Sequence, residues 1–238
     1  MPTRTEVLDA LSGVRDPELD EPITDLEFVS DIRAGDDEVD VELRLPTSFC
    51  APNFAYLMVH DAREALLAVP GVRQARVVLD DHHAAGEINA GAADGRGFTD
   101  TFSSFEQTEG DDLDELRGIF RRKAFVGRQE KLARRLLAEG YSPEELARMT
   151  ISELPASEQR DKYLQRRQEL GLGAAPEEPF LVSVEGETVP EEAVVEHLRR
   201  ARLTRLSVES NGSFCRAVLE ARHGERNGKR DRKDRASA

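Results

Sequence analysis

The chain has 238 residues, of which 39% are hydrophobic and 34% charged, and it contains no tryptophan. This length suits two units at the usual scale of roughly 100 to 200 residues per domain, while the high charge predicts some disordered stretches. A net charge of −14 argues against general nucleic-acid binding. No apolar run approaches the ~18 residues of a membrane span, so we expect a cytoplasmic protein.

The charge is unevenly distributed along the chain. Residues 1–115 carry 27 acidic and 8 basic side chains, whereas residues 116–238 carry 20 acidic and 25 basic ones. This asymmetry predicts two units that attract each other or different partners.

Residues 1–80 have the pattern of a small α+β domain. Thr3 and Glu6 stand at the spacing of a capping box, which opens a helix, and Pro52 suits the first position of a second helix. The predicted elements are a helix over 4–13, strands over 26–32 and 39–45, a helix over 52–69 and a strand over 72–79. The order α-β-β-α-β predicts one three-stranded sheet covered by two helices.

Residues 81–112 are rich in glycine and alanine and predict a long loop. Within it, Phe98, Phe102 and Phe105 recur at helical spacing, which indicates a short amphipathic helix. We expect this apolar stripe to dock on its own domain; the alternative is an anchor for a partner.

Residues 113–223 predict a mainly helical region. The predicted elements are helices over 113–139, from Ser142 onward and over 157–170, then a strand over 180–184, a helix over 190–202, a strand over 206–208 and a helix over 213–222. The last four would form a small α/β subdomain. Residues 224–238 contain no large apolar side chain and predict a disordered polar tail.

The sequence lacks the GxxxxGK(S/T), HExxH, CxxC and GxSxG motifs of common nucleotide, zinc and hydrolase sites. What remains is Cys50, just before a predicted helix, where free N–H groups and the helix dipole stabilise a thiolate. Such a thiolate can attack, bind a metal or accept sulfide; the alternative is a small buried hydrophobic residue. Cys215 lies beside Phe214 and Val218, and we assign it to the core.

The adjacent His82 and His83 follow the third predicted strand and are candidate ligands of a soft metal. Together with Cys50 they would supply three ligands. A metal site would therefore need a fourth ligand, from a carboxylate such as Asp25 or from a second subunit. The alternative is a solvated pair of surface histidines. Asp16, before Pro17, is typical of a turn closed by a capping aspartate.

Four motifs within residues 4–80 occur in a recognisable order and spacing. They are Asp16-Pro17-Glu18, Ile23-Thr24-Asp25-Leu26, Leu45 through Thr47 to Cys50-Ala51-Pro52, and Val69-Pro70-Gly71-Val72. This combination resembles the iron–sulfur cluster assembly domain family that includes SufT- and PaaD-like proteins. The resemblance implies that family's α/β assembly-protein fold. It also implies that Cys50 is the functional cysteine, with Thr47 and Asp25 as cofactor-binding positions and Asp16 and Glu18 as signature positions.

The sequence departs from the family pattern in two places. Glu27 stands where the family usually has glycine, and Ser48-Phe49 replaces the Pro-Gly commonly found before the cysteine. The Pro-Thr-x-Phe-Cys-Ala-Pro-Asn-Phe variant and the long C-terminal extension are also similar to proteins that accompany bacterial soluble di-iron monooxygenases.

The resemblance implies a maturation factor and not an enzyme. Its cofactor would be iron or an iron–sulfur cluster held transiently, because stable clusters normally need four protein ligands. The expected partner is a client metalloprotein, such as a di-iron monooxygenase component, recognised by the region after residue 98; a homodimer would double the ligands. The alternatives are a metal-free adaptor or chaperone, and a thiol enzyme in which His82 or His83 activates Cys50 as a base.

Overall fold

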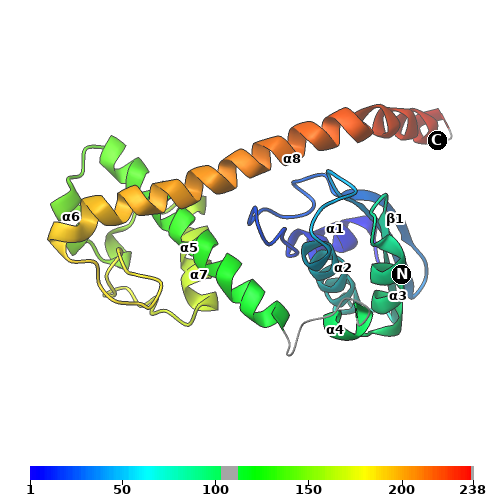
Figure 1. The fold of residues 1–238 in the computed structure, drawn as a ribbon, viewed down its shortest axis with the longest axis horizontal. Helices are drawn as coiled ribbons and strands as arrows, with labels where there is room; N and C mark the ends of the chain where they lie inside the picture. Colours follow the sequence, from blue (N-terminus) through cyan, green and yellow to red (C-terminus); the bar gives the residue numbers. More distant parts are fainter. Residues whose placement is uncertain (103–111, 237–238) are drawn as a thin grey trace. The chain divides into compact units, whose positions relative to one another are not determined.

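The computed structural model describes residues 1–102 and 112–236, and it describes side chains in the second range from Leu113 to Arg222. The chain divides into two compact units (Figure 1). Unit 1 comprises Met1–Glu115 and Asn211–Ala238, and unit 2 comprises Leu116–Ser210. The predicted α+β class is confirmed.

Unit 1 begins with α1 (Arg4–Ser12), which starts at the predicted capping box. The Thr3 hydroxyl accepts the Glu6 N–H at 3.2 Å, and the Glu6 carboxylate accepts the Thr3 N–H at 2.8 Å. Two donors at the helix start are thereby satisfied. Val7 and Leu11 lie one turn apart and are fully buried, so α1 presents one apolar side to the core.

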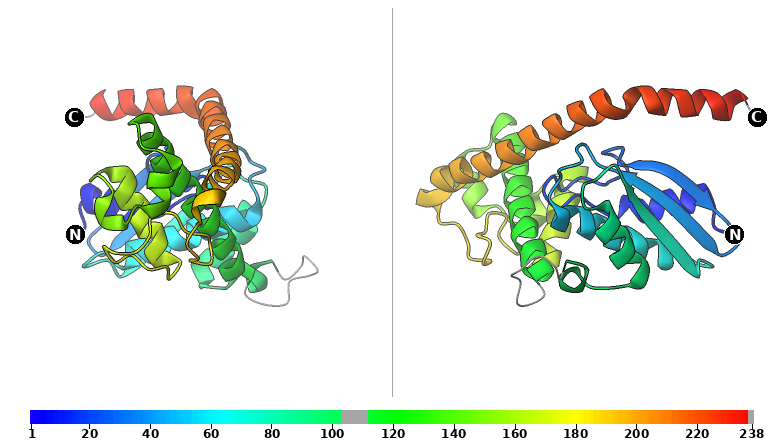
Figure 2. Two further views of the ribbon diagram at one scale, coloured as in Figure 1. Left: turned by 90° about the vertical axis from the view of Figure 1, so that its left-hand side faces the viewer. Right: turned by 45° about the vertical axis from the view of Figure 1, so that its right-hand side comes forward.

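The sheet has the strand order β1-β2-β3, from β1 (Val29–Ala34), β2 (Glu38–Arg44) and β3 (Gln74–Asp80) (Figure 2). The strands β1 and β2 form the predicted antiparallel hairpin, and β2 pairs with β3 in parallel. The helix α2 (Pro52–Leu67) supplies the crossover that a parallel pair requires. Because Val39, Val41 and Leu43 alternate with polar residues, one face of β2 is buried in the core.

The predicted loop over 81–112 is wrong in its first half, which forms α3 (Ala85–Asp94). The short helix predicted at Phe98 is present as α4 (Phe98–Thr101), and α3 packs closely against it. Small residues allow this, because a Cβ at Gly91 would overlap the Thr101 side chain. Phe98 and Phe102 dock on their own domain, with ring centroids 5.5 Å and 6.5 Å from that of Tyr56. Phe105 lies outside the described residues.

One side chain of α3 pairs with the backbone of the edge strand β3. The Asn89 amide donates to the Leu79 carbonyl at 3.1 Å and accepts the Leu79 N–H at 2.8 Å. On the other side of the strand, the Gln74 N–H bonds to the Asp37 carbonyl beside β2. The backbone N–H and C=O groups of Leu79 therefore point away from β2, and the side-chain amide of Asn89 satisfies both of them.

Unit 2 is helical and has its own hydrophobic core, which includes Phe125, Leu132, Tyr163 and Phe180. Its elements are the greater part of α5 (Asp112–Ala138), then α6 (Pro143–Arg148), η1 (Ile151–Glu153), α7 (Glu158–Glu169), η2 (Glu191–Ala193) and the start of α8 (Val194–Ala236). The three helices predicted before residue 171 are confirmed.

A buried amide crosses this core. Gln129 is 1% exposed and donates to the Val182 carbonyl at 3.1 Å, while its oxygen lies 2.6 Å from His197 Nε2. Because an amide oxygen only accepts, the imidazole Nε2–H is the donor. Burial lowers the pKa of His197 below its usual value.

The predicted α/β subdomain is wrong. Residues 180–184 form an isolated bridge, Val182↔Thr188, instead of a strand, and residues 206–208 lie inside α8. A short apolar run such as 206–208 is compatible with a strand or with a helix. Gly212 is the only glycine or proline between the two predicted helices, and the helix continues through it. The helices expected over 190–202 and 213–222 thus merge into α8, whose backbone remains helical to Ala236 through the predicted tail.

None of the helices in the described part of the chain combines the length and apolar character of a bilayer span.

Candidate functional site

Cys50 occupies the turn between β2 and α2, as predicted. Ala51 is the N-cap residue of α2 and Pro52 begins the helix, where a proline costs nothing because the first N–H groups have no helical partner. The Cys50 side chain is half-buried. The thiol thus lies beside the N-terminal end of a 16-residue helix.

Thr47 shapes this turn and reaches the thiol. Its carbonyl accepts the Cys50 N–H at 3.4 Å, and its hydroxyl accepts the Phe49 N–H at 3.2 Å. The same hydroxyl lies 3.6 Å from Cys50 Sγ. The predicted residue Thr47 is therefore a direct neighbour of the sulfur.

His82 binds the turn through the Cys50 backbone. Its Nε2 lies 2.8 Å from the Cys50 carbonyl oxygen, and its Nδ1 accepts the Ala84 N–H at 3.1 Å. A carbonyl only accepts, so Nε2 carries the proton and both ring nitrogens are used. Burial is the main reason why the pKa of His82 is lowered.

His83 binds the same turn one residue earlier. Both its backbone N–H and its ring Nδ1–H donate to the Ser48 carbonyl, at 2.9 Å and 2.7 Å. Its exposed ring stacks on Phe49 with centroids 5.7 Å apart, and its Nε2 carries the lone pair that could bind a metal.

Both histidines thus contact backbone carbonyls of the turn that carries Cys50. These contacts fix the turn and give His82 a structural role. A thiol enzyme would instead need a base within hydrogen-bond distance of Sγ, whereas the structure places the hydroxyl of Thr47 beside this sulfur.

Asp16 closes a turn, as its sequence context predicts. Its carboxylate accepts the backbone N–H groups of Glu18 at 2.9 Å and Leu19 at 2.8 Å. Burial outweighs these bonds and raises the pKa of Asp16 to about 6. Asp25 lies on the surface, with the Thr24 hydroxyl 3.4 Å from its carboxylate, so the carboxylates of Asp16 and Asp25 differ in environment.

Glu27 has a φ of +60°, in the left-handed region that glycine adopts readily and other residues at a cost. The backbone there closes a tight turn, because the Phe28 N–H bonds to the Ile23 carbonyl at 2.9 Å. The departure from the family pattern therefore falls on a position whose conformation favours glycine.

The part of α8 that belongs to unit 1 contacts the loops around the site. Asn211 donates to Glu18 at 2.9 Å, and Arg216 pairs with Glu21 at 2.6 Å. Arg222 donates to the Pro46 carbonyl and to the Asp81 carboxylate, both at 2.9 Å. Pro46 precedes Thr47, and Asp81 precedes His82.

Cys215 lies between these contacts and is half-buried, whereas its neighbour Phe214 is 64% exposed. The assignment of Cys215 to the apolar core is therefore wrong. Burial, followed by the negative charges of Asp16, Cys50 and Glu18, raises the pKa of its thiol to about 11. The apolar residues near Cys215 in the sequence, such as Val218, do not indicate which groups of unit 1 surround the thiol.

Within the described ranges, the structure brings no three cysteine, histidine or carboxylate side chains into a group that could hold a metal. His82 and His83 contact the backbone of the turn that carries Cys50, while Asp25 stays on the surface. Their proposed metal roles remain predictions.

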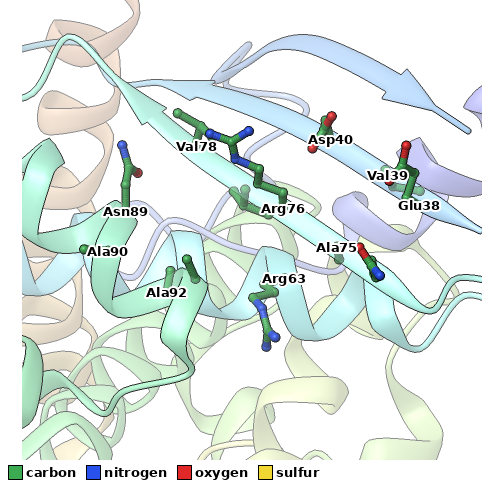
Figure 3. Close-up of a pocket in the computed structure, with 13 residues that line it drawn as sticks. Glu38, Val39, Asp40, Arg63, Ala75, Arg76, Val78, Asn89, Ala90 and Ala92 are labelled. Carbon is green, nitrogen blue, oxygen red and sulfur yellow. The ribbon is translucent and has the colours of Figure 1, made fainter.

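A cavity of about 690 Å³ lies elsewhere in unit 1, along β3. Arg63 of α2 and Asn89 and Ala92 of α3 line it, together with Asp40 and Arg76 of the sheet (Figure 3). It contains none of the predicted site residues.

The chain is similar to a known protein family and to a protein of another organism. Residues 4–78 match the family model described as iron–sulfur cluster assembly protein. An uncharacterized protein of Methanocaldococcus jannaschii is 34% identical over 91 residues, which cover 37% of this chain and 93% of that protein. No solved structure matches.

Proposed function

The chain belongs to the iron–sulfur cluster assembly protein family through residues 4–78, and we propose that it is a maturation factor that delivers iron or an iron–sulfur cluster to a client protein. Family membership supports a general role in iron–sulfur assembly or maturation. The delivered species is cargo, and Cys50 is its contact in this proposal.

The observation that carries the proposal is the fixed turn around Cys50. Its half-buried sulfur lies beside the start of α2 and 3.6 Å from the Thr47 hydroxyl. Thiolate is a preferred ligand of iron in clusters. A cluster held by fewer than four protein ligands is released easily, and this favours transfer over storage.

We further propose that unit 2 recognises the client. It has its own hydrophobic core and carries 17 basic and 16 acidic side chains. Most of the basic excess after residue 115 lies in residues 211–238, with 8 basic and 4 acidic side chains, so that segment can attract an acidic surface in addition to unit 2's own recognition of the client. A component of a di-iron monooxygenase is the client class that the sequence resemblance favours.

The test is anaerobic reconstitution of the full chain with ferrous iron and sulfide, followed by visible and Mössbauer spectroscopy. We expect the wild type to bind iron and Cys50→Ser to lose most of it. Ser48→Ala is the matched control, because only the backbone of Ser48 holds the turn. Equal iron in Cys50→Ser and the wild type would contradict a role for this thiol.

A metal-free adaptor is the competing function, and the full chain distinguishes it. In cells that depend on the client, an adaptor with Cys50→Ala would restore client activity as well as the wild type. A carrier would lose that rescue while still binding the client in a pull-down experiment.

A further inference from the structure

We propose that Cys215 is the second thiol of the Cys50 site, and that the two cysteines together bind one thiophilic metal ion or the edge of a cluster. This inference rests on the proposed function, because it names a further ligand for the same cargo. The sequence pattern around Cys215 assigned it to the core, and the family match ends at residue 78.

Cys215 lies on the side of α8 that contacts unit 1. Asn211, Cys215 and Arg222 are separated by four and seven residues, so they lie on one side of an α-helix. Asn211 and Arg222 both contact unit 1. Cys215 is one turn after the first contact and two turns before the second, and the same side includes Leu219, which is 6% exposed. Cys215 is therefore on the docked side of the helix.

Arg222 of the same helix binds next to the Cys50 turn. Its guanidinium contacts the Pro46 carbonyl at the start of the Cys50 turn and Asp81, next to His82, which binds the Cys50 carbonyl. One side chain of α8 thus joins both chain segments that fix Cys50. The docked helix and the Cys50 turn are held together by the same contacts.

The docked part of α8 also brings Cys215 into acidic surroundings. Asn211 and Arg216, which lie on either side of Cys215 in the sequence, bind the carboxylates of Glu18 and Glu21. Acidic neighbours disfavour a bare thiolate but favour a divalent cation in the same place. When a cation binds, each thiol releases its proton to solvent and coordinates through sulfur. Two thiolates leave coordination positions that sulfide or the client can fill, as a transfer site requires.

The proximity of the two thiols is tested first, with dibromobimane on the reduced full chain. This short reagent becomes strongly fluorescent when two thiols displace both bromides. We expect cross-linking within one chain in the wild type and none in Cys50→Ser or Cys215→Ser. Arg222→Ala should reduce it several-fold, whereas Arg200→Ala, a matched change at a residue that pairs with Glu196, should leave it unchanged. No cross-link in the wild type would overturn the proposal.

Metal binding is tested by anaerobic titration with Cd²⁺ alone, following the sulfur-to-cadmium charge-transfer absorption. We expect one Cd²⁺ per wild-type chain, and in Cys215→Ser about half the absorption and at least about tenfold weaker binding, a difference of ~1.4 kcal/mol. A Cys215→Ser titration identical to the wild type would overturn the inference.

The two proposals fail in different ways. Loss of iron in Cys50→Ser combined with unchanged cadmium and iron binding in Cys215→Ser would overturn only the role of Cys215. Unchanged iron–sulfur reconstitution in Cys50→Ser would overturn the proposed function itself.

Discussion

His82 and Cys50 are joined by a hydrogen bond of 2.8 Å between the imidazole Nε2–H and the Cys50 carbonyl oxygen. The bond spans 32 residues of sequence and links the segment after β3 to the turn before α2. Because the carbonyl and not the sulfur is engaged, the imidazole positions the thiol without competing for it.

We expect His82→Ala to loosen this turn. The substitution removes two hydrogen bonds of a buried ring, and its cost is about 1–3 kcal/mol of unfolding free energy. In a Cys215→Ser background, where Cys50 is the single thiol, iodoacetamide should modify Cys50 several-fold faster. His83→Ala is the comparison, because its exposed ring hydrogen-bonds to the Ser48 carbonyl and stacks on Phe49 without contacting Cys50 through a hydrogen bond; a larger effect there would contradict the role given to His82.

The raised pKa of Asp16 predicts that the stability of the folded chain depends on pH. Burial raises its pKa from 3.8 to about 6 in the folded chain, so the folded state keeps a proton that the unfolded state loses as pH rises. The free energy of unfolding therefore falls between pH 4 and 6, by roughly 3 kcal/mol at most, and stays at the lower value above pH 6.

Asp16→Asn should remove this loss, because an amide oxygen can still accept the N–H groups of Glu18 and Leu19. Urea denaturation should show the variant gaining stability over the wild type as pH rises from 4 to 6. The exposed Asp25→Asn is the control. A difference between Asp16→Asn and wild type that does not change with pH would refute the prediction.

Glu27→Gly is expected to stabilise unit 1. The left-handed conformation of Glu27 costs roughly 1–2 kcal/mol for a residue with a Cβ, and the greater entropy of unfolded glycine returns part of it. A net gain of about 0.5–1 kcal/mol should appear as a higher thermal midpoint. Asp25→Gly, at an ordinary φ in the same turn, should lower that midpoint.

Gln129→Leu is expected to destabilise unit 2 by about 2–4 kcal/mol, because it leaves the Val182 carbonyl and His197 without their buried partner. Denaturation followed by circular dichroism measures the change. Gln165→Leu is the matched control, since Gln165 is exposed and bonds only to Glu169. Equal effects would show that the buried amide contributes nothing specific.

Local features made much of unit 1 predictable from the sequence. The capping box at Thr3, the proline at the start of α2 and the alternation in β2 each depend on neighbours within a few residues. The position of Cys50 was predictable for the same reason, because a strand, a turn and a helix start follow one another directly.

The surroundings of Cys215 could not be predicted, because they depend on which side of α8 docks. Phe214 and Val218 suggest an apolar side, yet Phe214 points to solvent and the docked side carries Asn211 and Arg222. The merging of two predicted helices into α8 is a related error, since helical and extended structures suit a short apolar run equally well.

The amide of Asn89 has a consequence for how the sheet meets other chains. An unprotected edge strand can recruit a strand from a neighbour, which leads to aggregation or domain swapping. At Leu79 the outward N–H and C=O groups are already bonded to Asn89, so an incoming strand would first have to displace this amide. Asn89 thereby blocks the edge of β3 at this point and makes it harder for a second copy of the chain to add a strand to the sheet.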